Sequence, residues 1–246
     1  METEAMVQVA EPAMRFERKY RLDIRAYTCL QAALRRFARP DGFTEAQPKK
    51  RYFIRSLYFD TFDYSAYQEK MAGETNRIKL RLRSYWAERE QVAFVKAEIK
   101  TRMGNMVGKF AEQVGLDNAE CFAHKNEWDA EVGPVAQEFR RLALLKNQRP
   151  VLLVDYYREA FVPLDGSDVR ITFDHSLRFA AAQVLFPKHA FYQSASPRVV
   201  VLEIKSKEDE PSWLEEIVRS HSLTSEPNSK YAWGIEQTQH GVFINS

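Results

Sequence analysis

The chain has 246 residues, and its 36 basic and 34 acidic residues leave a formal net charge of +2. An apolar share of 45% supports a buried core, and the balanced charge excludes a partner recognised by overall charge alone. Its two cysteines lie in no CxxC pair or spaced Cys/His set, which argues against a structural zinc site.

The predicted elements begin after a loose leader over residues 1–14, which lack periodicity. Alternation over 15–22 predicts a strand, and Asp23 is a suitable N-cap for a helix over 24–38. A strand over 54–59 and a short helix over 64–71 follow.

Two long strands come next, over 77–86 and 91–102, and the polar turn 87–90 between them predicts a hairpin. We expect short helices within 103–133 and an amphipathic helix over 134–145.

The rest of the chain predicts three strands and two helices. The strands are expected over 150–163, 169–180 and 198–206, and the helices over 211–221 and from Ser229 onward. Because strands dominate and helices interrupt them, we expect one α+β domain over 15–246 built on an antiparallel sheet.

Several of these strands carry an apolar face and a charged face. Lys79, Arg81 and Arg83 share one face, and the Ile and Leu residues between them share the other. The same alternation recurs in three further stretches, 16–22, 95–102 and 199–207. A solvated sheet face would explain any single strand.

The charged faces together are strongly positive. Twelve cations share them, namely Lys19, Arg21, Lys79, Arg81, Arg83, Lys96, Lys100, Arg102, Arg158, Arg170, Lys205 and Lys207. Only three anions accompany them, Glu17, Glu98 and Glu203. Because like charges on neighbouring strands repel, the pattern favours an inward-facing cationic lumen that holds a polyanion.

The predicted fold is therefore a closed antiparallel β-barrel with its charged face inward and its helices packed outside. The three glutamates are candidate ligands for a divalent cation, which prefers carboxylate oxygens and bridges to phosphate oxygens. Phosphoryl transfer in such a site needs positioning and charge stabilisation rather than a covalent nucleophile.

The sequence resembles the VTC domain of polyphosphate polymerases, within the triphosphate tunnel metalloenzyme (CYTH-like) superfamily. Eight short segments carry the resemblance in order along the chain, and they are 16–20, 56–60, 79–83, 98–100, 156–161, 170–174, 202–205 and 229–231. The resemblance implies an eight-stranded tunnel and Mn²⁺ or Mg²⁺ as cofactor.

The resemblance and the charged faces together give the candidate site. The candidate catalytic residues are Lys19, Arg81, Arg83, Lys100, Arg158 and Arg170. The candidate phosphate-binding residues are Tyr58, Lys79, Lys205, Ser229 and Lys230. The candidate metal ligands are Glu17, Glu98 and Glu203. Asp174 is expected to be a salt-bridge partner on the face of Arg170.

Two departures from the family pattern are present. The superfamily signature Glu-x-Glu-x-Lys reads here as Arg15 to Lys19, without its first Glu, which favours the VTC branch. Some family members carry a further Lys just before the Ser-Lys-Tyr motif, and this chain has Glu226-Pro227-Asn228 there.

Three functions stay open from the sequence. The first is ATP-dependent polyphosphate synthesis, the second a tripolyphosphatase or nucleoside triphosphatase, and the third a non-catalytic polyphosphate- or nucleotide-binding module. ATP, polyphosphate and tripolyphosphate are the expected ligands.

Nucleic acid is not expected, because the sequence shows no exposed basic helix or stacking platform. No apolar run approaches the ~20 residues that span a bilayer, so we expect a cytoplasmic protein that could still bind a membrane protein.

Overall fold

The computed structural model describes residues 15–104, 106–207, 209–226 and 228–239, so the predicted leader over residues 1–14 lies outside the described part. The strands are β1 Phe16–Leu22, β2 Ala38–Pro40, β3 Tyr52–Asp60, β4 Asn76–Ser84, β5 Val95–Met103, β6 Met106–Val114, β7 Arg149–Pro163, β8 Val169–Ala181, β9 Gln193–Ser194 and β10 Val200–Ser206. The helices are α1 Ile24–Leu34, α2 Gly42–Glu45, α3 Ser65–Met71, α4 Leu116–Lys125, α5 Pro134–Leu145, α6 Ser212–Ser220 and α7 Lys230–Thr238, and a 3-10 turn η1 covers Arg89–Gln91.

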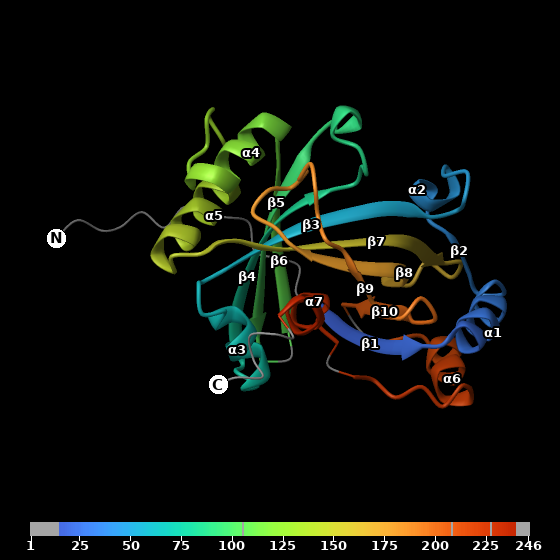
Figure 1. Cartoon of the computed structure of the whole chain (residues 1–246). Coiled ribbons are helices and arrows are strands. Elements are labelled where there is room, and N and C mark those ends of the chain that lie inside the picture. The colour runs from blue at the N-terminus through green and yellow to red at the C-terminus, as the bar shows by residue number, and fades with distance from the viewer. Residues whose placement is uncertain (1–14, 105, 208, 227, 240–246) are drawn as a thin grey trace.

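All strand pairs are antiparallel and belong to one curved sheet (Figure 1). Eight strands follow one path in the order β1-β10-β8-β7-β3-β4-β5-β6, while β2 pairs with β7 and β9 with β8. The predicted antiparallel fold with eight principal strands is therefore confirmed.

The predicted closure of the barrel is only partial. In the described residues the edge strands β1 and β6 share no continuous ladder. They meet at a single bridge, in which the backbone N–H groups of Arg15 and Val107 each donate to the other carbonyl over 3.3 Å. The sheet curves around an interior but is not closed by strand pairing.

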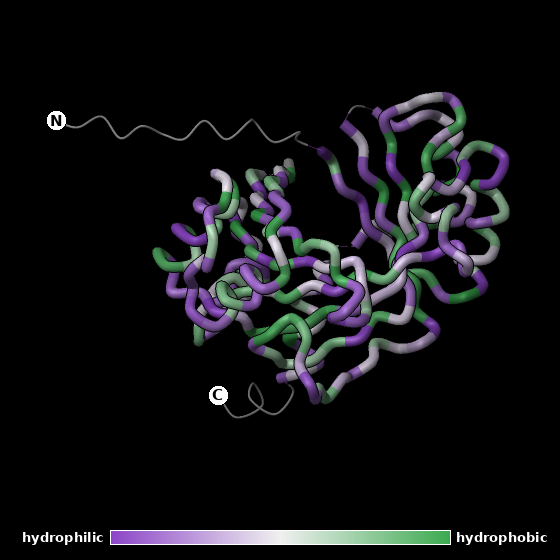
Figure 2. The backbone as a smooth tube through the Cα atoms, turned by 90° about the horizontal axis from the view of Figure 1, so that it is seen from above, coloured by the Kyte–Doolittle hydropathy of each residue, from purple (hydrophilic) through white to green (hydrophobic). Residues whose placement is uncertain are grey.

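The outer face of the sheet is apolar and covered by helices. Helices α4 and α5 pack on the β4–β5–β6 side, where Phe122 and Phe139 are fully buried. Helices α1 and α6 pack at the opposite end, where their buried Leu30 and Leu214 contact the outer side chains of β1, β8 and β10 (Figure 1). The alternation of hydrophilic and hydrophobic residues along the strands can be followed in Figure 2.

Helix α7 lies against the inner face instead. Leu152 and Phe179 belong to the same sheet face as Arg81 and Arg83, and they pack with Ile235 of α7. A Cβ atom at Gly234 would lie 2.6 Å from Leu152 and 2.8 Å from Phe179, so only glycine permits this close approach. The helix thereby fills part of the interior and brings its first residues to the remaining space.

Asp60 ties α7 to the rest of the chain. Its carboxylate accepts a short hydrogen bond from the Tyr231 hydroxyl of α7. The same carboxylate accepts from the backbone N–H groups of Ala66 and Tyr67 at the start of α3. One buried acceptor thus fixes two helices beside the interior.

Most predicted elements are found within a few residues of their expected bounds, and helix 134–145 is confirmed as α5. The helix expected over 24–38 ends at Leu34, and the chain continues into β2. Strand β6 was missed, because Gly108 and Glu112 interrupt the apolar face that carries Phe110 and Val114. None of the described helices has the length and apolar character needed to span a bilayer.

Candidate functional site

The inner face of the sheet encloses a cavity of about 620 Å³. Eleven Lys or Arg side chains and four Glu side chains line it. The cations are Lys19, Lys70, Arg77, Lys79, Arg81, Arg83, Lys100, Arg102, Arg158, Lys205 and Lys230. They come from β1, α3, β4, β5, β7, β10 and α7, so the predicted convergence of separate strands on one lumen is observed.

Twelve of the fourteen predicted site residues line this cavity, and Arg170 and Glu98 do not. Arg170 donates instead to Asp41 over 2.7 Å, with 42% of its side chain exposed. Glu98 is fully buried beneath the lining residues Arg81 and Arg83.

Glu17 and Glu203 form the centre of the first cluster of charges. Lys19 lies 3.3 Å from Glu17 and 3.7 Å from Glu203, and Lys205 lies 3.6 Å from each. Lys100 donates to Glu17 over 2.8 Å. Burial and the Glu203 carboxylate act to raise the pKa of Glu17, but Lys100, Lys19 and Lys205 outweigh them and hold it at about 2.

Glu203 is ionised for the same reason. Its burial opposes charge, yet Lys205, Lys19, Lys230 and Arg158 hold its pKa well below the ordinary value. Two ionised carboxylates therefore share a small set of lysines inside the cavity.

Asp174 anchors a second cluster. Arg158 donates to its two oxygens over 2.6 and 2.8 Å, which is a bidentate pair. Lys230 at the start of α7 lies 2.6 Å from Asp174, and Arg158 also lies 3.5 Å from Glu203. The predicted role of Asp174 as a salt-bridge partner is observed, although the partner is Arg158 rather than Arg170.

Glu98 anchors a third cluster. It accepts from Arg81 over 2.6 Å, and Arg83 and Lys109 lie 3.7 and 2.5 Å from it. Arg81 also donates to the Tyr58 hydroxyl over 2.9 Å. Burial raises the pKa of Tyr58, but Arg81 and Arg83 lower it further than burial raises it.

Four lining cations lie apart from these clusters. We call Lys70, Arg77, Lys79 and Arg102 the rim cations, because they adjoin the exposed stretch 71–76 where the cavity opens. Among the described residues, none of the four forms an ion pair with a carboxylate. Lys79 donates to Ser229 over 3.1 Å and lies 5.0 Å from the Tyr231 ring.

The predicted set of three carboxylate ligands is not brought together, because Glu98 is engaged by Arg81, Arg83 and Lys109. No group of three or more His, Cys, Asp or Glu side chains that could hold a metal ion occurs in the described ranges. Glu17 and Glu203 do face the same space, and Mg²⁺ typically takes one or two carboxylates together with substrate phosphates. The donor set therefore fits a divalent cation that binds with a phosphate ligand.

Sequence reasoning missed Lys109, Lys70 and Arg77 as parts of this charge array. Lys109 lies on β6, the strand that was not predicted, directly opposite Lys100. Arg77 shares the inner face of β4 with Lys79, so the two-residue period was a usable signal for it. Lys70 reaches the cavity from α3, which only the tertiary structure reveals.

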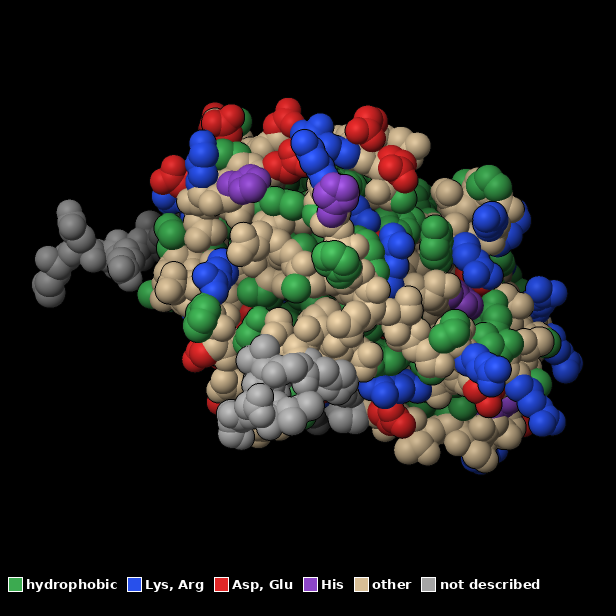
Figure 3. All heavy atoms as spheres, viewed as in Figure 1, with side chains coloured by type: hydrophobic (Ala, Val, Ile, Leu, Met, Phe, Trp, Pro, Cys, Tyr) green, Lys and Arg blue, Asp and Glu red, His purple; other side chains and the backbone are tan. Residues whose placement is uncertain are grey.

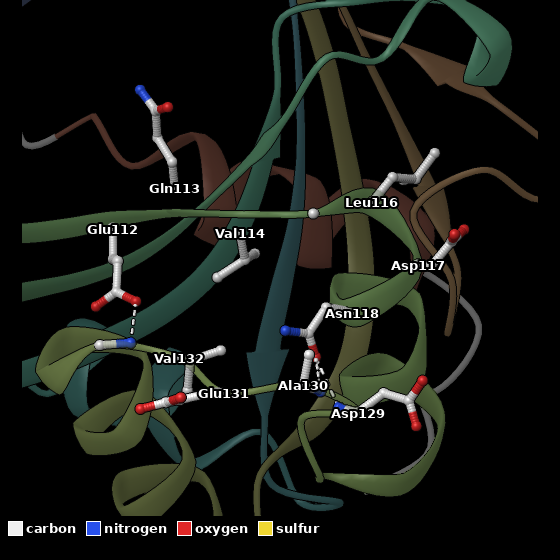
Figure 4. A pocket seen from close by; sticks show the side chains of 12 residues that line it. Glu112, Gln113, Val114, Leu116, Asp117, Asn118, Asp129, Ala130, Glu131 and Val132 are labelled. Atoms are coloured by element: carbon white, nitrogen blue, oxygen red, sulfur yellow. Dashed lines mark hydrogen bonds between the residues drawn. The ribbon is translucent and has the colours of Figure 1, made fainter.

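A second hollow of about 780 Å³ lies between the end of β6 and the starts of α4 and α5 (Figure 4). Its described lining contains Glu112, Asp117, Asp129 and Glu131 but no Lys or Arg. Glu112 accepts from the backbone N–H of Gly133 over 2.6 Å, which explains it as a cap for α5. This acidic hollow does not suit a phosphate ligand.

One face of the outer surface does not repeat the charge of the cavity. On the face seen in Figure 3, Lys and Arg side chains are interspersed with acidic and apolar ones. This face therefore does not share the concentration of cations that lines the cavity.

Comparison with known proteins agrees with this architecture. A family model described as the VTC domain matches residues 14–239. No curated protein sequence matches the chain.

Among solved structures, a candidate adenylate cyclase from Bacillus halodurans gives a TM-score of 0.55 at 13% identity, over 87% of this chain and 93% of that one. The PH1819 protein from Pyrococcus horikoshii gives 0.48 at 12% identity, over 90% and 98% of the two chains. The Mimivirus capping enzyme triphosphatase gives 0.35 at 8% identity, over 86% and 90%. At these identities the first likeness concerns the fold alone.

Proposed function

Because this chain belongs to the VTC domain family, we propose that it transfers the γ-phosphate of ATP onto a linear polyphosphate chain held in the cationic cavity. The observation that carries the proposal is the convergence of eleven cations from separate elements on one enclosed space. Such crowding of positive charge is tolerable when a polyanion fills the space.

In the proposed reaction, a terminal phosphate oxygen of the acceptor chain attacks the γ-phosphorus of ATP. The new P–O bond extends the chain by one phosphate, and the bond to the β–γ bridging oxygen breaks, so that ADP leaves with that oxygen. Both reactants are anionic, so the main task of the protein is to hold them together and to offset their charge.

We assign this task to the lining cations. Arg81, Arg83 and Arg158 are pre-oriented by Glu98 and Asp174, which fixes their guanidinium groups before phosphate binds. Lys19, Lys100 and Lys230 add point charges around the same space. Ser229, the N-cap of α7, and the start of that helix offer hydrogen bonds to one further phosphate oxygen.

Glu203 and Glu17 would hold Mn²⁺ or Mg²⁺ together with phosphate oxygens. When bound, the metal neutralises developing charge on the transferred phosphoryl group. Lys19 and Lys205, which lie 3.3–3.7 Å from the two carboxylates, would turn from them to the phosphate when both ligands bind.

The test is gel analysis of the products after incubation of the purified protein with ATP and Mn²⁺. The proposal expects polyphosphate that lengthens with time and ADP in proportion. Orthophosphate and short oligophosphates alone would show that water is the acceptor, which is triphosphatase activity. Tight binding of ATP without turnover under any metal would show a non-catalytic module.

A further inference from the structure

The rim cations Lys70, Arg77, Lys79 and Arg102 differ from the inner cations in having no carboxylate partner among the described residues. Arg77 donates to the backbone carbonyls of Glu69 and Lys70 over 3.5 and 3.3 Å, and Arg102 donates to that of Gly104 over 2.8 Å. These carbonyls orient the guanidinium groups but carry no net charge to neutralise them.

The strand register places like charges directly opposite one another. Arg77 pairs with Arg102 across β4 and β5, and Lys79 pairs with Lys100 two residues further along. Directly opposed like charges on one sheet face destabilise a sheet. Burial and the Arg102 charge lower the pKa of Arg77, and the more distant Glu69 and Glu74 carboxylates offset them only in part.

The rim lies at the open end of the cavity. Met71 is 54% exposed and Met103 is 65% exposed, and residues 72–76 are exposed as well. A chain that fills the inner cavity between Glu17, Asp174 and Glu98 would leave through this opening past the rim cations.

We propose that the rim cations bind the part of a linear polyphosphate that extends beyond the inner cavity, so that the protein prefers chains longer than tripolyphosphate. The inference deepens the proposed function and rests on its assignment of the cavity to phosphate. The rim groups come from α3, β4 and β5 and lie along one opening. They therefore suit a flexible polyanion whose charges are closely spaced. The inner residues would recognise phosphate groups, and the rim cations would favour longer polyphosphate chains.

The test is calorimetric titration without nucleotide or metal, at constant ionic strength, with tripolyphosphate and with size-fractionated long-chain polyphosphate. The wild type is expected to bind the long chain at least about tenfold more tightly. The double variant Arg77→Gln/Arg102→Gln should lose about tenfold in long-chain affinity and less than about threefold in tripolyphosphate affinity. The matched control Lys125→Gln/Arg140→Gln removes the same charge from α4 and α5 and should change neither affinity.

A wild type without length preference would overturn the inference, as would a rim variant that weakens both ligands equally. The single variant Lys70→Gln, on α3, supplies a second test that does not disturb the sheet, and it should reduce only long-chain affinity, by about threefold. Selective loss of long-chain affinity in a protein that makes no polyphosphate from ATP would support the inference while refuting the proposed function.

Discussion

Lys79 and Lys100 face each other across β4 and β5, and of the two only Lys100 lies within ion-pair distance of a carboxylate, that of Glu17. Burial, followed by the charges of Lys100, Lys19, Arg77 and Lys70, lowers the pKa of Lys79 to about 7. Its remaining contacts, Ser229 and the Tyr231 ring, carry no negative charge. A bound phosphate would therefore be its first anionic partner.

This relationship predicts that phosphate binding weakens with rising pH. Below about pH 7 Lys79 is charged, and above it the free protein must take up a proton when an anion binds. Lys79→Arg stays charged, so its affinity for long-chain polyphosphate should fall about five- to tenfold less than that of the wild type between about pH 7 and about pH 9.

The measurement is a metal-free titration at several pH values. Both proteins bind the same ligand, so titration of the ligand does not affect the ratio of the wild-type and variant affinities at a given pH. Some pH dependence should persist in the variant, because burial and Lys19 also lower the pKa of Lys100 to about 7. Parallel pH profiles for the two proteins would contradict the assignment of Lys79.

Glu203→Gln should reduce ATP turnover by at least about a hundredfold, because it removes one of the two carboxylates placed to hold the divalent cation. It also deprives Lys19, Lys205 and Arg158 of a shared counter-charge, so the melting temperature without ligand should fall and should recover with tripolyphosphate. Glu226→Gln is the control, since Glu226 lines the opening and has one ion pair within the described part of the chain, with Arg21 at 3.7 Å. Ordinary turnover in Glu203→Gln would refute the metal role.

Glu98→Gln should act on stability and not on metal affinity. Removing the charge that pairs with Arg81, Arg83 and Lys109 should cost about 3 kcal/mol in the free energy of unfolding, measured with denaturant. The Mn²⁺ concentration for half-maximal turnover should stay within about twofold of the wild type, in contrast to Glu17→Gln. An equal shift of that concentration in both variants would restore Glu98 to the metal site.

Arg81→Lys and Arg170→Lys separate the cavity from its surroundings. Arg81 lines the cavity, so losing its forked donors should weaken tripolyphosphate binding by about tenfold or more. Arg170 is engaged by Asp41 away from the lining, so its substitution should cost less than about threefold. Lysine keeps the positive charge beside Glu98 and Asp41, which protects folding. Equal losses would show that Arg170 reaches the phosphate.

The inward face of the sheet could be predicted from the two-residue period alone, because faces depend only on parity. The carboxylate partners of the cations could not be predicted in this way. The predicted four-residue turn over 87–90 would pair Arg81 with Lys96, whereas the observed loop from Tyr85 to Phe94 pairs Arg81 with Glu98. A register shift of two keeps every side chain on its face and changes every neighbour.

Other features depend on contacts far apart in the sequence. Arg170 was predicted on the correct face, yet Asp41, 129 residues away, holds it outside the cavity lining. Helix α7 was expected to pack outside with the others, and only the close approach at Gly234 shows why it packs inside. These packing relationships leave no periodic signal in the sequence.

The central claim is that the cavity transfers a phosphoryl group between two phosphate chains, and ³¹P NMR of one reaction with ATP and Mn²⁺ tests it most directly. We predict that the γ-phosphate signal of ATP converts into the signal of internal polyphosphate groups in step with ADP formation, and that Arg81→Lys slows both. Conversion of the γ-phosphate into orthophosphate alone, with no internal chain signal at any time, would contradict the account.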